Sequence, residues 1–342
     1  MSRNPIPWTE RLSPWRAPID VALGRYPFFA FGGPLNPKIL PVFHFHEVSP
    51  EYLEPHLLYL KDNGYRCAGA EEFLGIVERG EPIMPRTVFL TFDDAWASLW
   101  TVAAPLLRKH GMRAVTFAIP GRVSPSEGVR KTIEEDSEML EFGDRGEEPF
   151  CRWEELKRLD KEGVVEVESH TYAHEQIPVA GPSLGMWAET QCSEMPILSR
   201  PLVRKGEESF RPFDEREIGV PLLPTRSRMS DALRANECGE VTETDQEQRE
   251  AIRGDLILCR ETLEKRLERP IRILCFPWAV AGGVAREEAK VLGYRAAFSD
   301  SFPGKRFVHS KADPFQLMRL KHNWIYYLPG KGRKNIVGTR IH

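Results

Sequence analysis

The chain has 342 residues, enough to bury the core of one large α/β domain or of two small ones. Hydrophobic residues make up 41% and charged residues 28%, which is ordinary for a globular protein and excludes a disordered or fibrous one. The net charge of −3 gives no electrostatic sign of nucleic-acid binding.

The first twenty residues lack the continuous apolar core of a secretory signal peptide, and no window approaches the roughly 18 apolar residues of a membrane span. We therefore expect a cytoplasmic protein without a transmembrane segment, although peripheral contact with a membrane stays open. None of the six cysteines are paired at CxxC spacing, which favours reduced thiols over a disulfide framework. Nothing in the sequence predicts an oligomeric state.

Strands and helices are predicted to alternate along most of the chain. Residues 1–38 are rich in proline, glycine and aromatic residues, and we expect them to form an N-terminal arm. Apolar runs predict strands at 39–45, 65–68, 88–92, 113–119, 164–167, 271–276, 294–298 and 316–320. Helices are expected at 50–63, 70–78, 95–110, 153–161, 242–267 and 283–292. This alternation calls for parallel strands joined by right-handed crossovers.

The pattern is interrupted between residues 177 and 240, where proline, glycine, serine and charged residues are mixed. More than about 60 residues of weak pattern inside a domain are usually functional or disordered, so we expect an inserted lid or partner-contact segment. The resulting division is an arm at 1–38, one domain at 39–325 interrupted by the insertion at 177–240, and a tail at 326–342.

Two adjacent carboxylates, Asp93 and Asp94, follow the apolar strand at 88–92. In α/β proteins ligands bind at the carboxyl ends of the strands, so charge delivered there favours a functional site. A helix N-cap with an acidic neighbour explains the same pair equally well.

Two histidines, His170 and His174, follow the strand at 164–167. If this segment forms a helical turn, side chains four residues apart share one face and can bind one ion. Two imidazoles and one carboxylate form a good ligand set for a divalent metal such as Zn²⁺. Together with Asp94 the pair predicts a metal site, and Asp93 is then placed to act as a base toward water.

The motif TFDD at 91–94, SHxxxH at 169–174 and FPW at 276–278 resembles the polysaccharide deacetylase family, the NodB-homology or carbohydrate esterase family 4 domain. The resemblance covers roughly residues 40–176 and 245–322. It implies an α/β fold, a distorted (β/α) barrel of about seven parallel strands, here with a long insertion. The branch that it resembles most is the permuted one of the poly-N-acetylglucosamine deacetylases.

The resemblance also implies roles for single residues. Asp93 matches the family's general base, and Asp94, His170 and His174 match its metal ligands, most often for Zn²⁺. The stretch ending in Pro277 and Trp278 matches the motif that lines one wall of the groove, with the Trp278 N–H helping to hold the oxyanion. Trp153 begins a helix of family appearance and is a further candidate for stacking on a sugar.

Two positions depart from the family pattern. Ala95 stands where a turn glycine is usual, which is tolerable if its φ angle is negative. The groove motif usually contains an arginine that orients the base, and Leu274 and Cys275 occupy that region here. The means of tuning Asp93 is therefore in doubt.

The general acid is expected to be His46, which matches the histidine of the first strand in the permuted branch. Strand alternation puts His44 on the same side as His46, where we expect a hydrogen-bonded interior histidine. His322, late in the chain, is the competing candidate for the acid.

The resulting hypothesis is a metal-dependent hydrolase that removes an N- or O-acetyl group from an amino sugar or glycan precursor. Asp93 is expected to deprotonate the attacking water, and His46 to protonate the leaving group. One alternative is a catalytically silent barrel that binds a glycan or a partner in surface-polysaccharide biosynthesis. Another is an amidase or deformylase acting on a different C–N bond.

Overall fold

The computed structural model describes residues 22–136, 148–182, 223–236, 238–299, 305–310 and 312–334. The strands are β1 Ile39–Leu40, β2 Val42–Phe45, β3 Arg66–Cys67, β4 Thr87–Asp94, β5 Ala114–Ala118, β6 Val165–Ser169, β7 Gln176–Pro178, β8 Thr225–Ser227, β9 Ile273–Cys275, β10 Ala296–Phe298, β11 Val308–His309 and β12 Leu320–Lys321. The α-helices are α2 Pro50–Asp62, α3 Ala70–Leu74, α4 Ala104–His110, α5 Trp153–Glu162, α7 Asp245–Leu267 and α8 Gly283–Val291. Shorter 3₁₀ and π turns include η1 Phe28–Phe31, η2 Gly75–Arg79, η3 Leu99–Ala103, η4 Pro120–Arg122, η7 Pro277–Ala279 and η8 His322–Tyr327.

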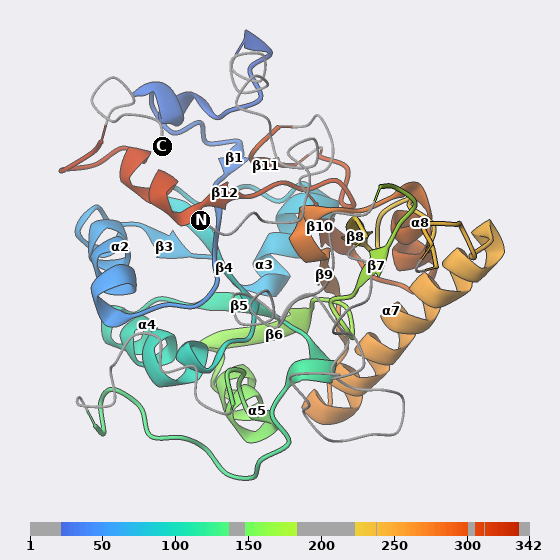
Figure 1. Ribbon diagram of the computed structural model, residues 1–342. Helices are drawn as coiled ribbons and strands as arrows, with labels where there is room; N and C mark the ends of the chain where they lie inside the picture. The colour runs from blue at the N-terminus through green and yellow to red at the C-terminus, as the bar shows by residue number, and fades with distance from the viewer. Residues whose placement is uncertain are drawn as a thin grey trace.

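The main sheet runs in the order β10-β9-β6-β5-β4-β2-β12, with every neighbouring pair parallel. Its two ends approach each other through the segment before β12, because Phe298 of β10 forms a parallel bridge with Leu317. Figure 1 shows α2, α4, α5 and α7 outside this curved sheet. The predicted α/β barrel of about seven parallel strands is thus confirmed.

Alternate residues of the strands divide the core into two layers. Val88, Leu90 and Phe92 of β4 belong to the cluster that also contains the apolar residues of α2, α4, α5 and α7. Phe89 belongs to a second cluster, with residues such as Val115, Phe117, Ile273 and Phe298 from the neighbouring strands. This second cluster fills the barrel interior, and Phe73 of α3 stacks on Phe89 within it. The period of two along β4 therefore directs Thr91 and Asp93 inward as well.

Two predicted elements are broken in the structure. The strand expected at 39–45 is split at Pro41, which has no N–H for a ladder bond, so β1 pairs antiparallel with β11 while β2 joins the main sheet. The helix expected at 95–110 begins later, with η3 at Leu99. Its start is delayed because Asp94 and Ala95 have φ angles of 70° and 56°, outside the helical region.

The described parts of the arm and the tail lie against each other. The guanidinium of Arg333 donates to the carbonyls of Phe29, Gly32 and Gly33, at 2.6–2.7 Å. The rings of Tyr26 and Trp324 stack with centroids 5.4 Å apart. Of the insertion, the described flanks β7 and β8 form an antiparallel pair. Residues 1–21, 183–222 and 335–342 lie outside the described residues, so the proposed boundaries stay predictions.

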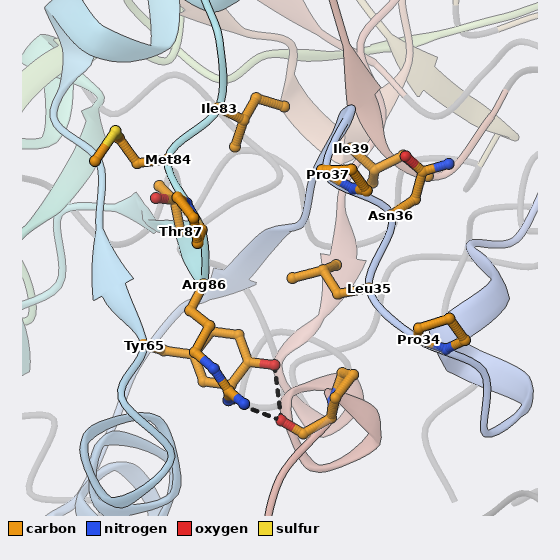
Figure 2. A pocket seen from close by; sticks show the side chains of 12 residues that line it. Pro34, Leu35, Asn36, Pro37, Ile39, Tyr65, Ile83, Met84, Arg86 and Thr87 are labelled. Atoms are coloured by element: carbon orange, nitrogen blue, oxygen red, sulfur yellow. Dashed lines mark hydrogen bonds between the residues drawn. The ribbon is translucent and has the colours of Figure 1, made fainter.

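A cavity of about 280 Å³ lies where the arm meets the start of β4 and the tail (Figure 2). Tyr65 and Arg86 both donate to the carbonyl of Pro329 at its edge, at 2.9 and 3.3 Å. The lining residues Ile39 and Thr87 are the first residues of β1 and β4, so this cavity is at the amino ends of the strands. Among the described helices, none is long and apolar enough to cross a bilayer.

Candidate active site

The two carboxylates Asp93 and Asp94 end strand β4 at the carboxyl edge of the barrel. Their side chains are 4% and 1% exposed. Asp93 continues the inward series of Phe89 and Thr91 along the strand. Burying two adjacent carboxylates is costly unless each is paired, so their partners indicate what they do.

The partner of Asp93 is Arg319, from the segment that closes the barrel just before β12. Its Nη1 donates to Asp93 Oδ1 at 2.6 Å and its Nη2 to Oδ2 at 2.8 Å. Nη1 also donates to Thr91 Oγ1 at 3.0 Å. Burial alone would raise the pKa of Asp93, but the charge and hydrogen bonds of Arg319 outweigh it and hold the pKa well below its usual range. An arginine therefore does orient this carboxylate, although it comes from the segment before β12 and not from the groove motif around Leu274 and Cys275.

Asp94 is grouped with His170 and His174, as predicted. Its Oδ1 lies 3.3 Å from His170 Nε2 and 3.7 Å from His174 Nε2. The three residues are buried, and one ligand atom of each lies within 4.8 Å of the others. The strand ends of β4 and β6 thus supply a set of two imidazole nitrogens and one carboxylate oxygen, which suits a divalent metal.

The hydrogen bonds around these three side chains fit the role of metal ligands. His170 Nδ1 donates to the carbonyl of Cys275 at 2.7 Å, which fixes the ring with its Nε2 directed toward Asp94. The Trp96 indole N–H donates to Asp94 Oδ2 at 3.0 Å. Asp94 Oδ1 is buried and has no hydrogen-bond partner among the described residues. A buried carboxylate oxygen left unbonded between two imidazoles is what a metal ion would satisfy.

Asp94 is ready to bind as an anion. Burial would raise its pKa, but the nearby imidazoles of His170 and His174 outweigh burial and lower the pKa to about 2. A carboxylate must be deprotonated to bind a metal, and Asp94 is already ionised at neutral pH. Binding of a metal to Asp94 therefore releases no proton from this group.

The segment from His170 to His174 is an irregular loop, and the helical turn considered from its spacing is wrong. Thr171 and His174 have φ angles of 65° and 51°, which no helix contains. Asp255 of α7 holds this loop by accepting the backbone N–H groups of Tyr172 and Ala173, at 2.8 and 3.1 Å. The two histidines therefore meet at Asp94 because of the loop conformation rather than because of helical spacing.

Backbone strain is concentrated in this region. Of the eight described non-glycine residues with positive φ, six belong to the site: Asp94, Ala95, Thr171, His174, Trp278 and Ala279. Such conformations cost energy and typically persist where function requires them. The condition that Ala95 has a negative φ is not met, because its φ is 56°, and the chain tolerates a left-handed alanine here.

His46 and His44 both face the barrel interior near Asp93. The Nε2 atom of His46 lies 3.6 Å from Asp93 Oδ2, and its side chain is 50% exposed. The ring of His44 lies 5.5 Å from that of His46. Burial lowers the pKa of His44 well below its usual value, so this imidazole is neutral. The expected hydrogen bond is not found at His44 Nδ1, which has no partner in the part of the chain that the structure describes.

His322 is on the other side of β2. Its ring stacks on Phe45, with centroids 5.3 Å apart, and its Nδ1 lies 2.9 Å from the Tyr52 hydroxyl. Because strand side chains alternate, the Phe45 face is opposite to the face of His44 and His46. Burial, as the largest cause, lowers the pKa of His322 to about 4. Between the two candidates for the acid, the structure brings His46 to Asp93.

The candidates for contact with a sugar lie in two places, some at the site and one among the helices outside the sheet. Trp278 lies at the metal cluster, with its ring 4.1 Å from the ring of His174. Pro277 is buried beside it in η7. The ring of Trp153 instead faces the guanidinium of Arg266 on α7, at 5.1 Å, and packs against the core. The structure therefore groups Trp278 and Pro277, but not Trp153, with the other site residues.

Three residues at the site were missed from the sequence: Arg319, Trp96 and Asp255. The signal for Arg319 was a lone charge inside the apolar run Leu317–Leu320, because a buried charge needs a partner. The signal for Asp255 was an acid next to the buried positions Ile252 and Leu256 of α7. Trp96 gave no signal, since its bond to Asp94 depends on the left-handed turn between them.

The chain is similar to known proteins over the region that holds this site. A model of the family described as polysaccharide deacetylase matches residues 81–201, a range that contains both carboxylates and both histidines. The poly-beta-1,6-N-acetyl-D-glucosamine N-deacetylase of Escherichia coli K12 is 24% identical over 258 residues, which are 75% of this chain. An enzyme of the same name from Staphylococcus aureus N315 is 28% identical over 127 residues, 37% of this chain and 38% of the relative. The chain spans only 31% of the length of the E. coli relative.

Solved structures share the fold. The BpsB deacetylase domain from Bordetella bronchiseptica aligns with a TM-score of 0.57 and 17% identity, over 84% of this chain and 97% of that one. IcaB from Ammonifex degensii aligns with a TM-score of 0.51 and 18% identity, over 86% and 97% of the two chains. At 17% and 18% identity, these likenesses show the fold. The sequence match shows that residues 81–201 carry a region of the polysaccharide deacetylase family, the NodB-homology or carbohydrate esterase family 4 group.

Proposed function

We propose that the chain is a metal-dependent hydrolase that removes an N-acetyl, or O-acetyl, group from an amino sugar or glycan precursor. The observation that carries this proposal is the buried group of Asp94, His170 and His174, directly beside an Asp93 that Arg319 holds ionised. A metal-ligand set next to an ionised carboxylate is the arrangement that metal-assisted hydrolysis needs.

Asp94, His170 and His174 would hold the divalent ion, for which Zn²⁺ is the best fit to one carboxylate and two imidazoles. When bound, such an ion supplies Lewis acidity that polarises the acetyl carbonyl and makes water easier to deprotonate. The hydrogen bond from His170 Nδ1 to the Cys275 carbonyl supports this assignment, because it fixes the ring orientation before binding.

Asp93 would accept the proton of the attacking water. Two conditions for a general base are met, since the carboxylate is ionised at neutral pH and is held in one orientation by two hydrogen bonds from Arg319. The low pKa also limits its strength as a base. We infer that correct positioning, more than basicity, is its contribution.

His46 would donate a proton to the leaving amine or alcohol. Its Nε2 lies 3.6 Å from Asp93 Oδ2, so acid and base flank the same space, and its half-exposed ring can reach a bound sugar. The backbone N–H of Trp278 would stabilise the oxyanion, with Pro277 fixing the turn. The Trp278 ring beside His174 would offer an apolar face for a sugar ring.

The relatives suggest the first substrates to test. The E. coli and S. aureus relatives are named as acting on poly-β-1,6-N-acetyl-D-glucosamine. We propose an acetylated glucosamine polymer or its precursor as the substrate class.

An acetate-release screen tests the proposal. Purified protein would be incubated with N- and O-acetylated glucosamine oligomers and precursors, with and without a chelator, and then with added Zn²⁺ or Co²⁺. We expect release from at least one acetylated amino sugar, loss of release with chelator and recovery on adding metal. Release that is unaffected by chelator, or hydrolysis only of a formamide or another amide, would contradict the proposal.

The alternative of a catalytically silent barrel loses one of its two supports. It rested on the absence of an arginine beside the base and on the insertion at 177–240. Arg319 supplies that arginine with two short hydrogen bonds. A catalytically silent barrel also does not require the buried ligand set around Asp94, which this chain has.

A further inference from the structure

A second group of metal-ligating side chains lies next to the first and shares no residue with it. One nitrogen of His44, one nitrogen of His46 and one oxygen of Asp93 all lie within 4.8 Å of one another. His46 Nε2 and Asp93 Oδ2 are 3.6 Å apart, a separation that two ligands of one ion can have. Imidazole and carboxylate are again the donor types that Zn²⁺ prefers.

His44 distinguishes this group from a chance meeting of polar side chains. It belongs to β2, between Thr91 of β4 and Lys321 of β12, and points into the barrel. Its Nδ1 atom is buried and has no hydrogen-bond partner among the residues that the structure describes. A buried polar nitrogen without a partner is costly, and a bound cation can compensate that cost.

We propose that His44, His46 and Asp93 form a second divalent-cation site, weaker than the site of Asp94, His170 and His174, and that its occupation blocks the reaction. The inhibitory part of this inference rests on the proposed function. The binding part does not, because it concerns only these three side chains.

The guanidinium of Arg319 explains why the second site is the weaker one. It already donates to both oxygens of Asp93, at 2.6 and 2.8 Å, and a cation at the same carboxylate is repelled by its charge. In the described residues no guanidinium donates to Asp94 Oδ1, which has no hydrogen-bond partner and is open to an ion. The first ion therefore fills the Asp94 site, and only excess metal reaches Asp93.

Inhibition follows from which atoms the second ion would occupy. Coordination would use the lone pair of His46 and an oxygen of Asp93, the proposed acid and base. Neither group could then hold or transfer a proton. A third grouping, of Asp93, His170 and Cys275, does not provide an independent site, because His170 already belongs to the first one.

Metal-binding stoichiometry tests the inference directly. Protein stripped with a chelator would be titrated with Zn²⁺ in equilibrium dialysis, and acetate release would be followed over the same range. We expect two ions to bind in separate steps, with activity rising over the first and falling over the second. Binding of a single ion, or activity that still rises as the second ion binds, would overturn the inference.

Substitutions at His44 locate the second ion. His44→Gln and His44→Leu should each weaken the second binding step by at least about tenfold and leave the first unchanged. Inhibition by excess Zn²⁺ should be relieved to the same extent. His56→Gln is the matched control, because His56 is also buried with an unbonded ring nitrogen in the described chain but lies outside the ligand group. An unchanged second step in both folded His44 variants would refute the site.

The dialysis and acetate-release measurements distinguish failure of the second site from failure of the proposed function. If no acetylated sugar is hydrolysed, the proposed function fails, and dialysis of the wild type and the His44 variants still decides whether the second site exists. If acetate is released but a single ion binds, only the second site is refuted.

Discussion

The pair of Asp93 and Arg319 is the clearest case of one residue setting the chemistry of another. A carboxylate this deeply buried would ordinarily take up a proton, and two hydrogen bonds from one guanidinium prevent it. The pair also links two parts of the sheet, since Asp93 lies near the end of β4 and Arg319 directly precedes β12, in the segment that closes the barrel. Charge and position of the base therefore depend on closure of the sheet.

Substitution of Arg319 should alter the pH dependence of the reaction. In the wild type, Asp93 is ionised well below neutral pH, so it does not set the acidic limb of kcat/KM. In Arg319→Met burial dominates, the pKa of Asp93 rises, and the acidic limb should move to higher pH. Arg319→Lys keeps the charge but not the two-point contact, and should shift the limb less. A pH profile of acetate release that is the same in all three proteins would contradict this assignment.

At the scale of single residues, the sequence predicts the reactive groups but not how they are held. Asp93, Asp94, His46, His170 and His174 were found because they lie at or just after predicted strands, in an order that resembles a known family. Arg319 was missed because its partner is 226 residues away along the chain, a pairing that only the closed barrel reveals. The hydrophobic period of a strand indicates the face to which each side chain points. A contact between distant strands can be predicted only when the register of the two strands is known.

The loop after β6 and helix α7 act together on the metal ligands. Thr171 and His174 have left-handed backbone conformations, and Asp255 offsets part of that strain through two backbone N–H groups. Helix α7 itself is well predicted, since Thr244 caps it with Glu247 in a capping box. The sequence thus predicts the helix, while its role in shaping the site appears only from the structure.

Asp255→Asn should weaken metal binding at the Asp94 site. An asparagine offers one acceptor and one donor where two backbone N–H groups need acceptors, so one of the two bonds is lost. We expect the Kd for Zn²⁺ to rise by about tenfold or more, as for other residues that orient ligands. Competition with a metal-binding dye measures it.

Asp231→Asn is a suitable control for this experiment. Asp231 also accepts a backbone N–H, from Gly283 at 2.7 Å, but it serves the start of α8 rather than the ligand loop. Equal metal affinities in the Asp255→Asn and Asp231→Asn proteins would argue against a positioning role for Asp255.

On the scale of the whole molecule, the described part of the N-terminal arm packs against the described part of the C-terminal tail. The segment before the tail passes α2 and β2, where His322 stacks on Phe45 and contacts Tyr52. Arg333 of the tail then donates to the carbonyls of the arm. The sequence predicts the arm and the tail as separate pieces of weak pattern. Their contact is missed because aromatic stacking between distant segments has no period.

This packing should make stability sensitive to acid. Burial lowers the pKa of His322 to about 4 in the folded state, below the usual value of about 6.5 in an unfolded chain. Unfolding therefore takes up a proton between these values, and the free energy of unfolding should fall as pH drops from 6.5 to 4. His322→Phe should reduce that fall by about 1–2 kcal/mol, because the ring is only partly buried. Urea unfolding at pH 7 and 4.5 measures the free energy of unfolding of the wild type and of His322→Phe. An equal decrease in both proteins between these pH values would contradict this role of His322.

The central claim is that Asp94 binds the metal while Asp93 reacts, and Asp93→Asn in metal-loaded protein tests it most directly. The variant should keep the fold and bind the first Zn²⁺ as the wild type does. Its rate of acetate release should fall by about 10²–10⁴-fold, as expected on removing a general base. Acetate release at a rate close to that of the wild type, from a folded and metal-loaded Asp93→Asn protein, would contradict the division of roles between the two carboxylates.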